Sequence, residues 1–573
     1  MQNNSKDAIN EFHPKSEDGV HTAAAPSVLA PVTMQDRIAV LDVIRGFALI
    51  GIFLMNVEFF NRPVGELGQG MPAGLLGLNW LASYVIAYFV AGKFWTIFSL
   101  LFGMGFALML TRTEAKGQEF LRPYFRRLIA LAIFGLLHYI LIWPGDILFS
   151  YAIAAAGLLL ILFADLRWVF SAAALLALCA AIPILNDLIA IAIVLILLAS
   201  LAFLLRTEVT LSFFGKDMPI TAAVLYVMGG IAVLISVLGF LIPAMKAARG
   251  VIFVAGFFFL LAFAFMRAHQ PKEDRPWKIG ALFYCTLFVA MTIGGGVEYW
   301  STKESPTAAS KAETQIAPSL AASAPLVAVS PTDTRKAATE ERKKKQLEQE
   351  QKNAANIQLE AQVLTKGTYL EAVKFRAKKF AENWTNVVIF SLLINCMFLI
   401  GFWFVRSGTM EDTRAHLPLF RKLAIWGLPI GIGLGMAGSL FATAPAQGAE
   451  NDPFSFATGL LYLGNLPACL GYVSLVILMF NSAGAYPKIK ILAPYGRMAL
   501  TNYLSQSLIC SAVFYGYGMG YFGMQRAHQV VFVAVVVMLQ IASSHWWLSN
   551  FRYGPMEWLW RAVTYWKLPA FKI

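Results

Sequence analysis

The chain has 573 residues, of which 58% are hydrophobic and 14% charged, and its mean hydropathy is +0.62. A soluble globular protein of this length needs a larger charged surface, so the composition excludes that class. The formal net charge of +13 is placed in loops between apolar runs, which favours membrane topology over nucleic-acid binding. We therefore predict membrane lipids, and no nucleic acid, as partners.

The first segment, residues 1–37, is polar and lacks the apolar core of a secretory signal, so we predict a disordered cytoplasmic tail. Apolar runs of about 20 residues then match the hydrocarbon thickness of a bilayer. In lipid each run has to be a helix, because its backbone groups must bond within the segment. The predicted fold is an all-α polytopic transmembrane bundle of about fourteen spans, with both termini cytoplasmic. The spans are 38–60, 79–110, 124–143, 146–164, 168–186, 188–206, 220–242, 249–268, 279–298, 385–405, 421–442, 455–480, 497–520 and 530–549.

These spans suggest a division of the chain into further segments. The segments are an N-terminal membrane core (38–186), additional transmembrane helices (187–300), an extracytoplasmic linker with a charged helix (301–383), a C-terminal membrane bundle (384–550) and a cytoplasmic interfacial tail (551–573). The second span is too long for one straight crossing, so we expect a break near Gly92 and Lys93. The mixed charges of 340–379 predict a solvated helix or spacer.

Basic loops set the orientation. Residues 112–127 contain five Lys or Arg residues, which places this loop in the cytoplasm by the positive-inside rule. The basic loops 406–422 and 488–497 then lie on the same side, whereas 444–452 on the other side has no Lys or Arg. Lys246 and Arg249 are the exception, because they fall on the outer side.

Polar residues inside the first span are candidate functional groups, because charge is costly in lipid. Asp42 and Arg45 are three residues apart and can pair on one helix face. Asn56 follows Arg45 by eleven residues, which places it on the same stripe about 16 Å further along. Gly46 would admit a closely packed neighbour. The pair is either a packing lock or part of a functional stripe.

His138 and Asp146 form a second candidate cluster, at the outer ends of the third and fourth spans. A base and an orienting carboxylate on adjacent antiparallel helices is the geometry of general base catalysis. The alternatives are a helix cap for Asp146 and a simple interhelical hydrogen bond for His138.

Further candidate groups are Lys93, which needs a partner or a water-filled cavity within the membrane, and Arg497, which suits a phosphate or the membrane interface. Arg126, Arg127 and Asn502 complete the candidate substrate-binding set. The sequence has no phosphate loop, no His-Glu-x-x-His and no paired-cysteine spacing, so no metal site and no ATP-driven pump are predicted.

Several motifs together resemble the YeiB-like bacterial inner-membrane proteins, a family of unknown function. The matching residues include Leu41-Asp42, Arg45-Gly46, Asn56, Lys93-Phe94-Trp95, His138, Trp143, Gly145-Asp146, Gly496-Arg497, Thr501-Asn502-Tyr503, Gly554-Pro555 and Glu557-Trp558. The resemblance covers roughly residues 37–170 and 365–567, and it implies a multi-pass protein of the bacterial cytoplasmic membrane.

That family is distantly similar to membrane acyltransferases, such as heparan-α-glucosaminide N-acetyltransferase and bacterial sugar O-acetyltransferases. The similarity implies transfer of an acyl group from cytoplasmic acyl-CoA to an extracytoplasmic sugar, lipid or amine, with no other cofactor. The bacterial enzymes have a His at the place of Asn56, and the human-type enzyme has an Asn there and a His at the place of Leu67. His138 would then be the base, Asp146 its orienting carboxylate and Asn56 the oxyanion donor.

Two other classes stay open at this stage. A transporter or flippase of a small or lipid-linked anion would use the same intramembrane charges to line a substrate path. A sensor or scaffold would use the charged segment 340–379 to meet a partner.

Overall fold

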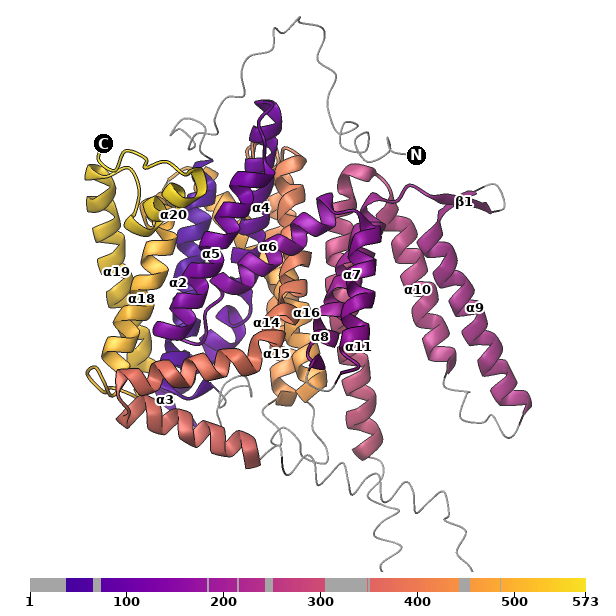
Figure 1. The fold of residues 1–573 in the computed structure, drawn as a ribbon, viewed down its shortest axis with the longest axis horizontal. Helices are drawn as coiled ribbons and strands as arrows, with labels where there is room; N and C mark the ends of the chain where they lie inside the picture. Colours follow the sequence, from indigo (N-terminus) through magenta and orange to yellow (C-terminus); the bar gives the residue numbers. More distant parts are fainter. Residues whose placement is uncertain are drawn as a thin grey trace, which may run out of the picture.

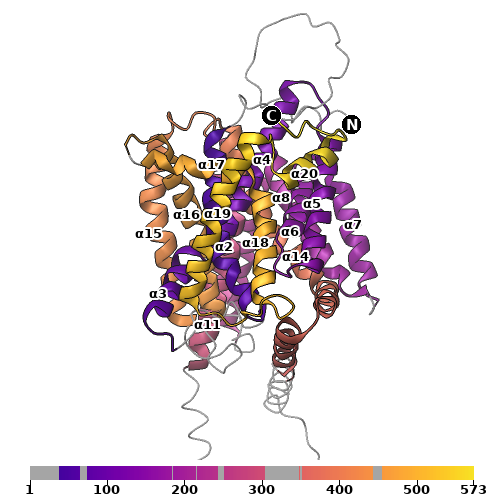
Figure 2. The same cartoon turned by 90° about the vertical axis from the view of Figure 1, so that its left-hand side faces the viewer.

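The computed structural model describes residues 38–64, 74–182, 185–213, 216–242, 251–303, 348, 351–442, 454–484 and 486–573. The predicted tail 1–37, Leu67, Lys246, Arg249 and most of the linker therefore lie outside the described residues. Within the described part, the chain folds as a bundle of helices (Figures 1 and 2), which confirms the all-α class. A two-stranded hairpin, β1 (Thr210–Phe213) with β2 (Lys216–Pro219), is a small departure that the prediction missed.

Eleven helical segments of the described residues are long and apolar enough to cross a membrane. They comprise α2 (Ala39–Asn61), the segment α3 (Gly77–Val85) with η2 (Ile86–Val90) and α4 (Lys93–Ala115), α5 (Leu121–Leu141), α8 (Leu188–Arg206), α9 (Ile220–Leu241), α10 (Val251–His269), α11 (Arg275–Lys303), α14 (Tyr369–Arg406), α15 (Leu417–Ala442), α16 (Phe454–Asn481) and α19 (Arg526–Asn550).

Three other predicted spans correspond to shorter helices. These are α6 (Leu148–Phe163), α7 (Leu166–Cys179) and α18 (Ala499–Phe514), with 16, 14 and 16 residues. Each is shorter than the roughly 20 residues of a straight crossing, so the total of fourteen spans stays a prediction. The short helices α17 (Leu492–Arg497) and α20 (Pro555–Tyr565) flank α18 and α19 in the C-terminal region.

The expected break in the second span is present. A π-helical turn ends at Val90, and Gly92 adopts φ = 78°, a left-handed conformation that suits glycine. Helix α4 starts anew at Lys93. The long apolar segment is therefore two helices joined at a bend, and this bend places Lys93 inside the bundle.

The charged segment is helical over most of the part that the structure describes, as two consecutive helices. A helix over 351–366 precedes α14, and α14 itself runs for 38 residues from the predicted linker into the membrane. Thr368 starts α14 with a capping box to Glu371. Glu360 is 3% exposed and its carboxylate lies 2.9 Å from the Nζ atom of Lys379. Arg376 is buried and donates to the carbonyl groups of Ile140 and Leu141 at the end of α5, which attaches the start of α14 to the bundle. Residues 351–359 are largely exposed, as a solvated helix would be.

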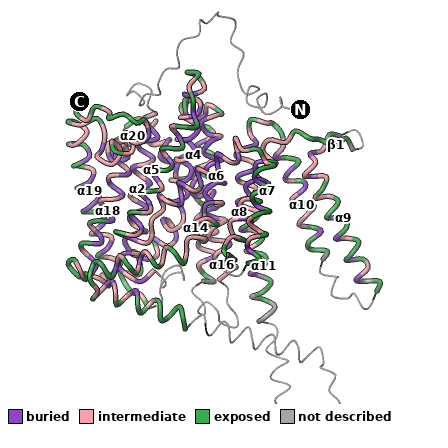
Figure 3. The backbone as a smooth tube through the Cα atoms, viewed as in Figure 1, coloured by how far each residue is buried: buried purple, intermediate pink, exposed green. Residues whose placement is uncertain are grey.

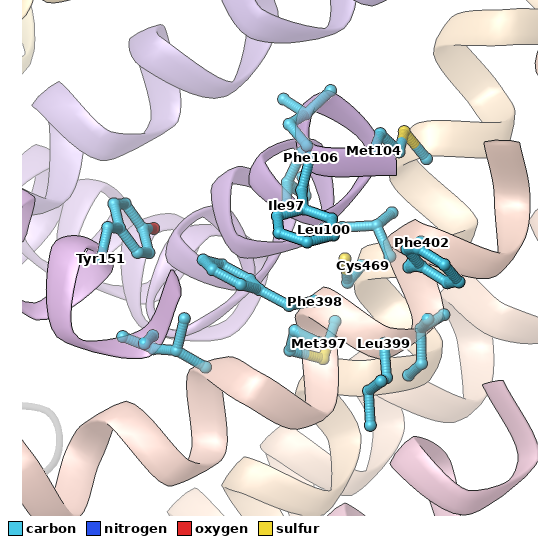
Figure 4. Close-up of a cluster of buried hydrophobic side chains, with 14 of the residues drawn as sticks. Ile97, Leu100, Met104, Phe106, Tyr151, Met397, Phe398, Leu399, Phe402 and Cys469 are labelled. Carbon is cyan, nitrogen blue, oxygen red and sulfur yellow. The ribbon is translucent and has the colours of Figure 1, made fainter. Parts of the chain in front are cut away.

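The core lies where α4 crosses α14, and glycines bring the two backbones together (Figure 4). A Cβ atom on Gly103 would lie 2.2 Å from the carbonyl oxygen of Phe398, and one on Gly401 would lie 2.0 Å from that of Leu100. By contrast α9 and α10 form a hairpin beside the bundle with largely exposed apolar surfaces (Figure 3), as expected for helices that face lipid.

Candidate functional site between two cavities

One face of α2 lines two cavities. Arg45, Leu49 and Ile52 line a cavity of about 360 Å³ toward the N-terminal end of the helix. Ile52, Asn56 and Phe59 line a second cavity of about 450 Å³ toward its C-terminal end. A spacing of three to four residues is that of one helix face. The stripe from Arg45 to Asn56 thus runs along both cavities.

The first cavity is strongly basic, and we call it the arginine cavity. Its basic lining residues are Arg45, Arg112, Lys116, Arg127, Arg497 and Arg561. Among the residues that the structure describes, two carboxylates line it, those of Asp42 and Glu557. Such an excess of cationic groups around one hollow attracts polyanions such as phosphates.

Several of these basic groups are held in place by the fold. The Nη1 atom of Arg45 lies 2.6 Å from Asp42, which confirms the predicted pairing. The guanidinium of Arg127 stacks over the Trp560 ring at 4.2 Å, and the Trp560 indole donates a hydrogen bond to the Arg127 carbonyl. Arg126 instead lies over Trp566 and is not among the residues that line the cavity.

The second cavity, which we call the Asn56 cavity, opens at the other end of α2. Glu58, Arg62 and Arg526 line it. The Glu58 carboxylate lies 2.8 Å from Nη1 of Arg526 and 3.0 Å from Nε of Arg62. These three residues were not among the predicted site residues. The pairing of Glu58 with Arg62 could have been predicted, because the two are four residues apart at the end of a span.

Two isoleucines, Ile52 and Ile147, line both cavities. Ile52 is 3% exposed, so its side chain fills the space where the cavities approach each other. On the arginine side this layer continues to Tyr151 and Tyr503, and on the other side to Trp143 and Gly145. An apolar layer thus separates two hollows that start from opposite ends of α2.

His138 and Asp146 lie beside this layer. The Nδ1 atom of His138 is 2.9 Å from Oδ1 of Asp146, and the two side chains are 1% and 0% exposed. The other carboxylate oxygen accepts the backbone N–H of Phe149 and so caps the first turn of α6. Asp146 therefore does both things that the sequence left as alternatives: it caps a helix and orients a histidine.

The second ring nitrogen of His138, Nε2, has no hydrogen-bond partner among the described residues. The imidazole lies 5.3 Å from the Tyr503 ring, measured between centroids, and Tyr503 lines the arginine cavity. His138 itself lines neither cavity. The structure thus places the pair against the separating layer, with the Tyr503 ring next to the imidazole.

The C-terminal motifs build the wall opposite α2. A Cβ atom on Gly496 would lie 1.9 Å from the Asp42 carbonyl oxygen, and one on Gly46 would lie 2.4 Å from that of Leu492. Helices α2 and α17 therefore touch through these two glycines. This contact confirms the prediction that Gly46 admits a closely packed neighbour. This contact positions Arg497, the last residue of α17, at the arginine cavity.

Glu557 joins α20 to the start of α18. Its carboxylate accepts hydrogen bonds from the backbone N–H groups of Leu500 and Thr501 and from the Thr501 hydroxyl. These are first-turn donors, which no carbonyl within the helix can satisfy. Burial raises the pKa of the Glu557 carboxyl above its usual value, against the effect of these hydrogen bonds. Glu557 is therefore a helix cap supplied from a distant part of the chain.

Asn502 lies away from both cavities, although the sequence placed it with the substrate-binding residues. Its amide donates to the Tyr495 carbonyl and to Ser544 on α19. Gln506, one turn further on, donates to the Tyr495 hydroxyl and to Gln540. These bonds form a buried network that joins α17, α18 and α19, so the described contacts of Asn502 are with the protein itself.

Lys93 is 0% exposed and its Nζ atom has no hydrogen-bond partner among the described residues. It is not in the lining of either cavity, but its neighbours Gly92 and Trp95 line the Asn56 cavity, as does Asn465 of α16. Asn465 was not predicted. A lone Asn in an apolar run is a detectable signal, but its proximity to Lys93 depends on the bend at Gly92.

The comparisons with known proteins point to one family. Residues 404–567 match a family model described as DUF418, a protein of unknown function. The chain is 26% identical over 545 residues to "Uncharacterized protein YxaH" of Bacillus subtilis, covering 94% of this chain and 97% of that protein. It is 41% identical to "Uncharacterized protein YeiB" of Escherichia coli over 95 residues, which cover 17% of this chain and 24% of that protein. The YeiB-like resemblance is confirmed.

The names of these relatives state no activity. A further one, an uncharacterized 39.9 kDa protein of Bacillus acidopullulyticus, is 36% identical over 137 residues, or 37% of its length. No solved structure matches the chain. The long apolar helices support a membrane protein, whereas the similarity to acyltransferases stays a prediction.

Proposed function

We propose that the protein is an integral-membrane acyltransferase that moves an acyl group from cytoplasmic acyl-CoA to an acceptor on the other side of the membrane. The observation that carries the proposal is the position of His138 and Asp146, beside the layer where the two cavities approach each other. A base at that place serves donor and acceptor substrates that enter from opposite sides.

The arginine cavity is the proposed donor site. The loop charges of the sequence put it on the cytoplasmic side, where acyl-CoA is found. Arg45, Arg127 and Arg497 supply cationic groups for the CoA phosphates. From them the cavity runs inward to Ile52 and Tyr151, an apolar end that suits the acyl chain.

The Asn56 cavity is the proposed acceptor site. In the reaction, an acceptor hydroxyl or amine attacks the thioester carbonyl, and the C–S bond of acyl-CoA breaks as the new ester or amide bond forms. His138 takes the acceptor proton at Nε2 and passes it to the leaving CoA thiolate, while Asp146 holds Nδ1. Asn56 donates to the developing oxyanion. Tyr503 has to turn aside for His138 to reach the substrates, because its ring lies next to the imidazole.

The test uses the purified full chain in lipid nanodiscs. Acetyl-CoA is expected to raise its unfolding temperature. The chain in proteoliposomes is expected to release free CoA thiol when a panel of amino sugars, polyols, acidic sugars and sugar phosphates is enclosed. His138→Gln should abolish thiol release and keep the stabilisation, whereas His545→Gln, on an exposed histidine of α19, should change neither. A wild type that acetyl-CoA neither stabilises nor supplies for thiol release would contradict the acyltransferase, and full activity of His138→Gln would contradict the role of His138 as the base.

A transporter of a small or lipid-linked anion is the second candidate. The observation that favours it is the apolar layer of Ile52 and Ile147 between two opposed cavities, since such a layer is what an alternating-access gate needs. Anion flux into proteoliposomes without any acyl-CoA, and insensitive to His138→Gln, would favour this class over the enzyme.

A further inference from the structure

A polar corner of the Asn56 cavity is left without partners. Gly92 and Asn465 touch, since a Cβ atom on Gly92 would lie 2.4 Å from the Asn465 Nδ2 atom. Lys93 is the next residue, and its Nζ atom would lie 3.4 Å from a Cβ atom on Gly435 of α15. Gly435 in turn packs against Gly464, the neighbour of Asn465, since a Cβ atom on Gly464 would lie 3.3 Å from the Gly435 nitrogen. The Lys93 ammonium and Asn465 therefore lie near the same contact between α15 and α16, and Asn465 lines the Asn56 cavity.

Both side chains are 0% exposed. The Lys93 Nζ atom and both polar atoms of the Asn465 amide lack hydrogen-bond partners in the part of the chain that is described. Burying an ammonium without a counter-ion costs on the order of several kcal/mol, and a buried amide also loses its hydrogen bonds to water. Lys93 and Asn465 thus present three buried polar atoms whose hydrogen bonds the described residues do not supply.

The charge around this corner decides the kind of ligand. No carboxylate of the described residues forms an ion pair with Lys93, and the Glu58 carboxylate is already shared by Arg526 and Arg62. Asn465 lines the cavity, with its amide atoms buried in the cavity wall. An ammonium and an amide N–H are donors that suit an oxyanion.

We propose that Lys93 and Asn465 form an oxyanion site in the wall of the Asn56 cavity, which takes a carboxylate or a phosphate group. Lys93 supplies the charge and the Asn465 amide supplies a directed donor. Arg62 and Arg526 at the same cavity attract anions toward it. The inference rests on the proposed function in one respect: if the Asn56 cavity holds the acceptor, the acceptor is an acidic sugar or a phosphorylated molecule rather than a neutral polyol.

The experiment measures the unfolding temperature of the full chain in nanodiscs, with no acyl-CoA present. The probes are inorganic phosphate and glucuronate, with glucose and chloride at matched concentration and ionic strength as controls. Phosphate or glucuronate is expected to raise the unfolding temperature of the wild type in a saturable way, and their relative strength tells which oxyanion is preferred. Lys93→Met is expected to lose the response and Asn465→Ala to weaken it several-fold. Lys378→Met, on an exposed lysine of α14 that lines neither cavity, is expected to retain it.

The unfolding temperature of Lys93→Met without any anion also shows whether this variant folds. Without an anion the substitution removes a buried, uncompensated charge, so the variant's unfolding temperature is expected to equal or exceed that of the wild type. An anion response that survives in Lys93→Met, or no response of the wild type to either oxyanion, would overturn the proposal. Because acyl-CoA is absent throughout, these outcomes are independent of whether the chain transfers acyl groups.

Discussion

Ile52 of α2 and Ile147 at the start of α6 both line the arginine cavity and the Asn56 cavity. The two residues lie far apart in the sequence and meet where the cavities approach each other. In the proposed reaction, a base beside such a layer acts on two substrates that never share a compartment, and we expect the layer to keep the membrane sealed meanwhile.

The sealing role gives a first prediction. Replacing both residues, Ile52→Ala with Ile147→Ala, truncates the two side chains that line both cavities and should connect the cavities. We expect a small fluorophore to leak from proteoliposomes that contain the double variant, with a stability loss of about 2–5 kcal/mol from buried Ile52. Leu49→Ala is the matched control, because Leu49 lines only the arginine cavity. Equal leakage from the control and the double variant would contradict the layer.

The contact between α2 and α17 gives a second prediction. Gly496→Ala places a methyl group against the Asp42 carbonyl oxygen, where a Cβ atom would lie only 1.9 Å away. The backbones have to separate, which should cost about 1–3 kcal/mol and lower the unfolding temperature. Gly105→Ala is the control, since its Cβ atom meets nothing within 4 Å. A control that loses as much stability as Gly496→Ala would contradict the close packing.

The buried cap at Glu557 gives a prediction about pH. Because burial raises the pKa of this carboxyl, the folded state keeps its proton to higher pH than the unfolded chain, whose carboxyl titrates near the usual value of 4.5. The contribution of Glu557 to stability is therefore greatest below that value and falls as pH rises through the raised pKa. Glu557→Gln keeps an acceptor for Leu500 and Thr501 but cannot titrate.

The measurement is the unfolding temperature of both proteins across the acidic range. From pH 4 upward, the wild type is expected to lose stability relative to Glu557→Gln. Glu557→Ala should be less stable than either by about 1 kcal/mol or more, because it leaves the first-turn donors of α18 unsatisfied. Parallel curves for the wild type and the Gln variant would show that Glu557 does not titrate in this way.

The arginine cavity gives a prediction about ligand binding. Arg127→Gln removes a guanidinium that Trp560 holds at the cavity wall. Because one charge-assisted hydrogen bond contributes about 1.5–3 kcal/mol, CoA should bind at least about tenfold more weakly to this variant. Arg167→Gln is the control, as Arg167 of α7 lines neither cavity. Titration calorimetry with CoA in nanodiscs measures both, and equal affinities would exclude Arg127 from the donor site.

Much of the fold followed from the sequence, because lipid leaves the backbone few choices. The apolar runs predicted helices at all fourteen places, and the glycine at the bend before Lys93 marked the break. The predicted start of the span at residue 385 was wrong, because α14 already begins at Tyr369 and its first part is charged. The contact that attaches this first part to the bundle, from Arg376 to the Ile140 carbonyl, joins residues that are distant in the sequence.

The candidate site was predictable only where its residues share an element or adjacent elements. Arg45 and Asn56 follow from helical spacing, and His138 with Asp146 follows from two antiparallel helices joined by a short turn. Glu557 as a cap and Asn465 beside Gly92 depend on how distant helices pack. The same is true of Arg126 and Asn502, whose polarity marked them as candidates although they lie outside both cavities.

The most direct test of the central claim locates the acyl group of a bound donor. An acyl-CoA analogue with a diazirine in its acyl chain is irradiated with the full chain in nanodiscs, and the labelled residues are mapped by mass spectrometry. If the acyl chain lies in the arginine cavity, we expect labelling around Ile52, Ile147, Tyr151 and Tyr503, and we expect excess CoA to suppress it. Labelling that excess CoA leaves unchanged, or that falls on the lipid-facing helices α9 and α10, would contradict this placement.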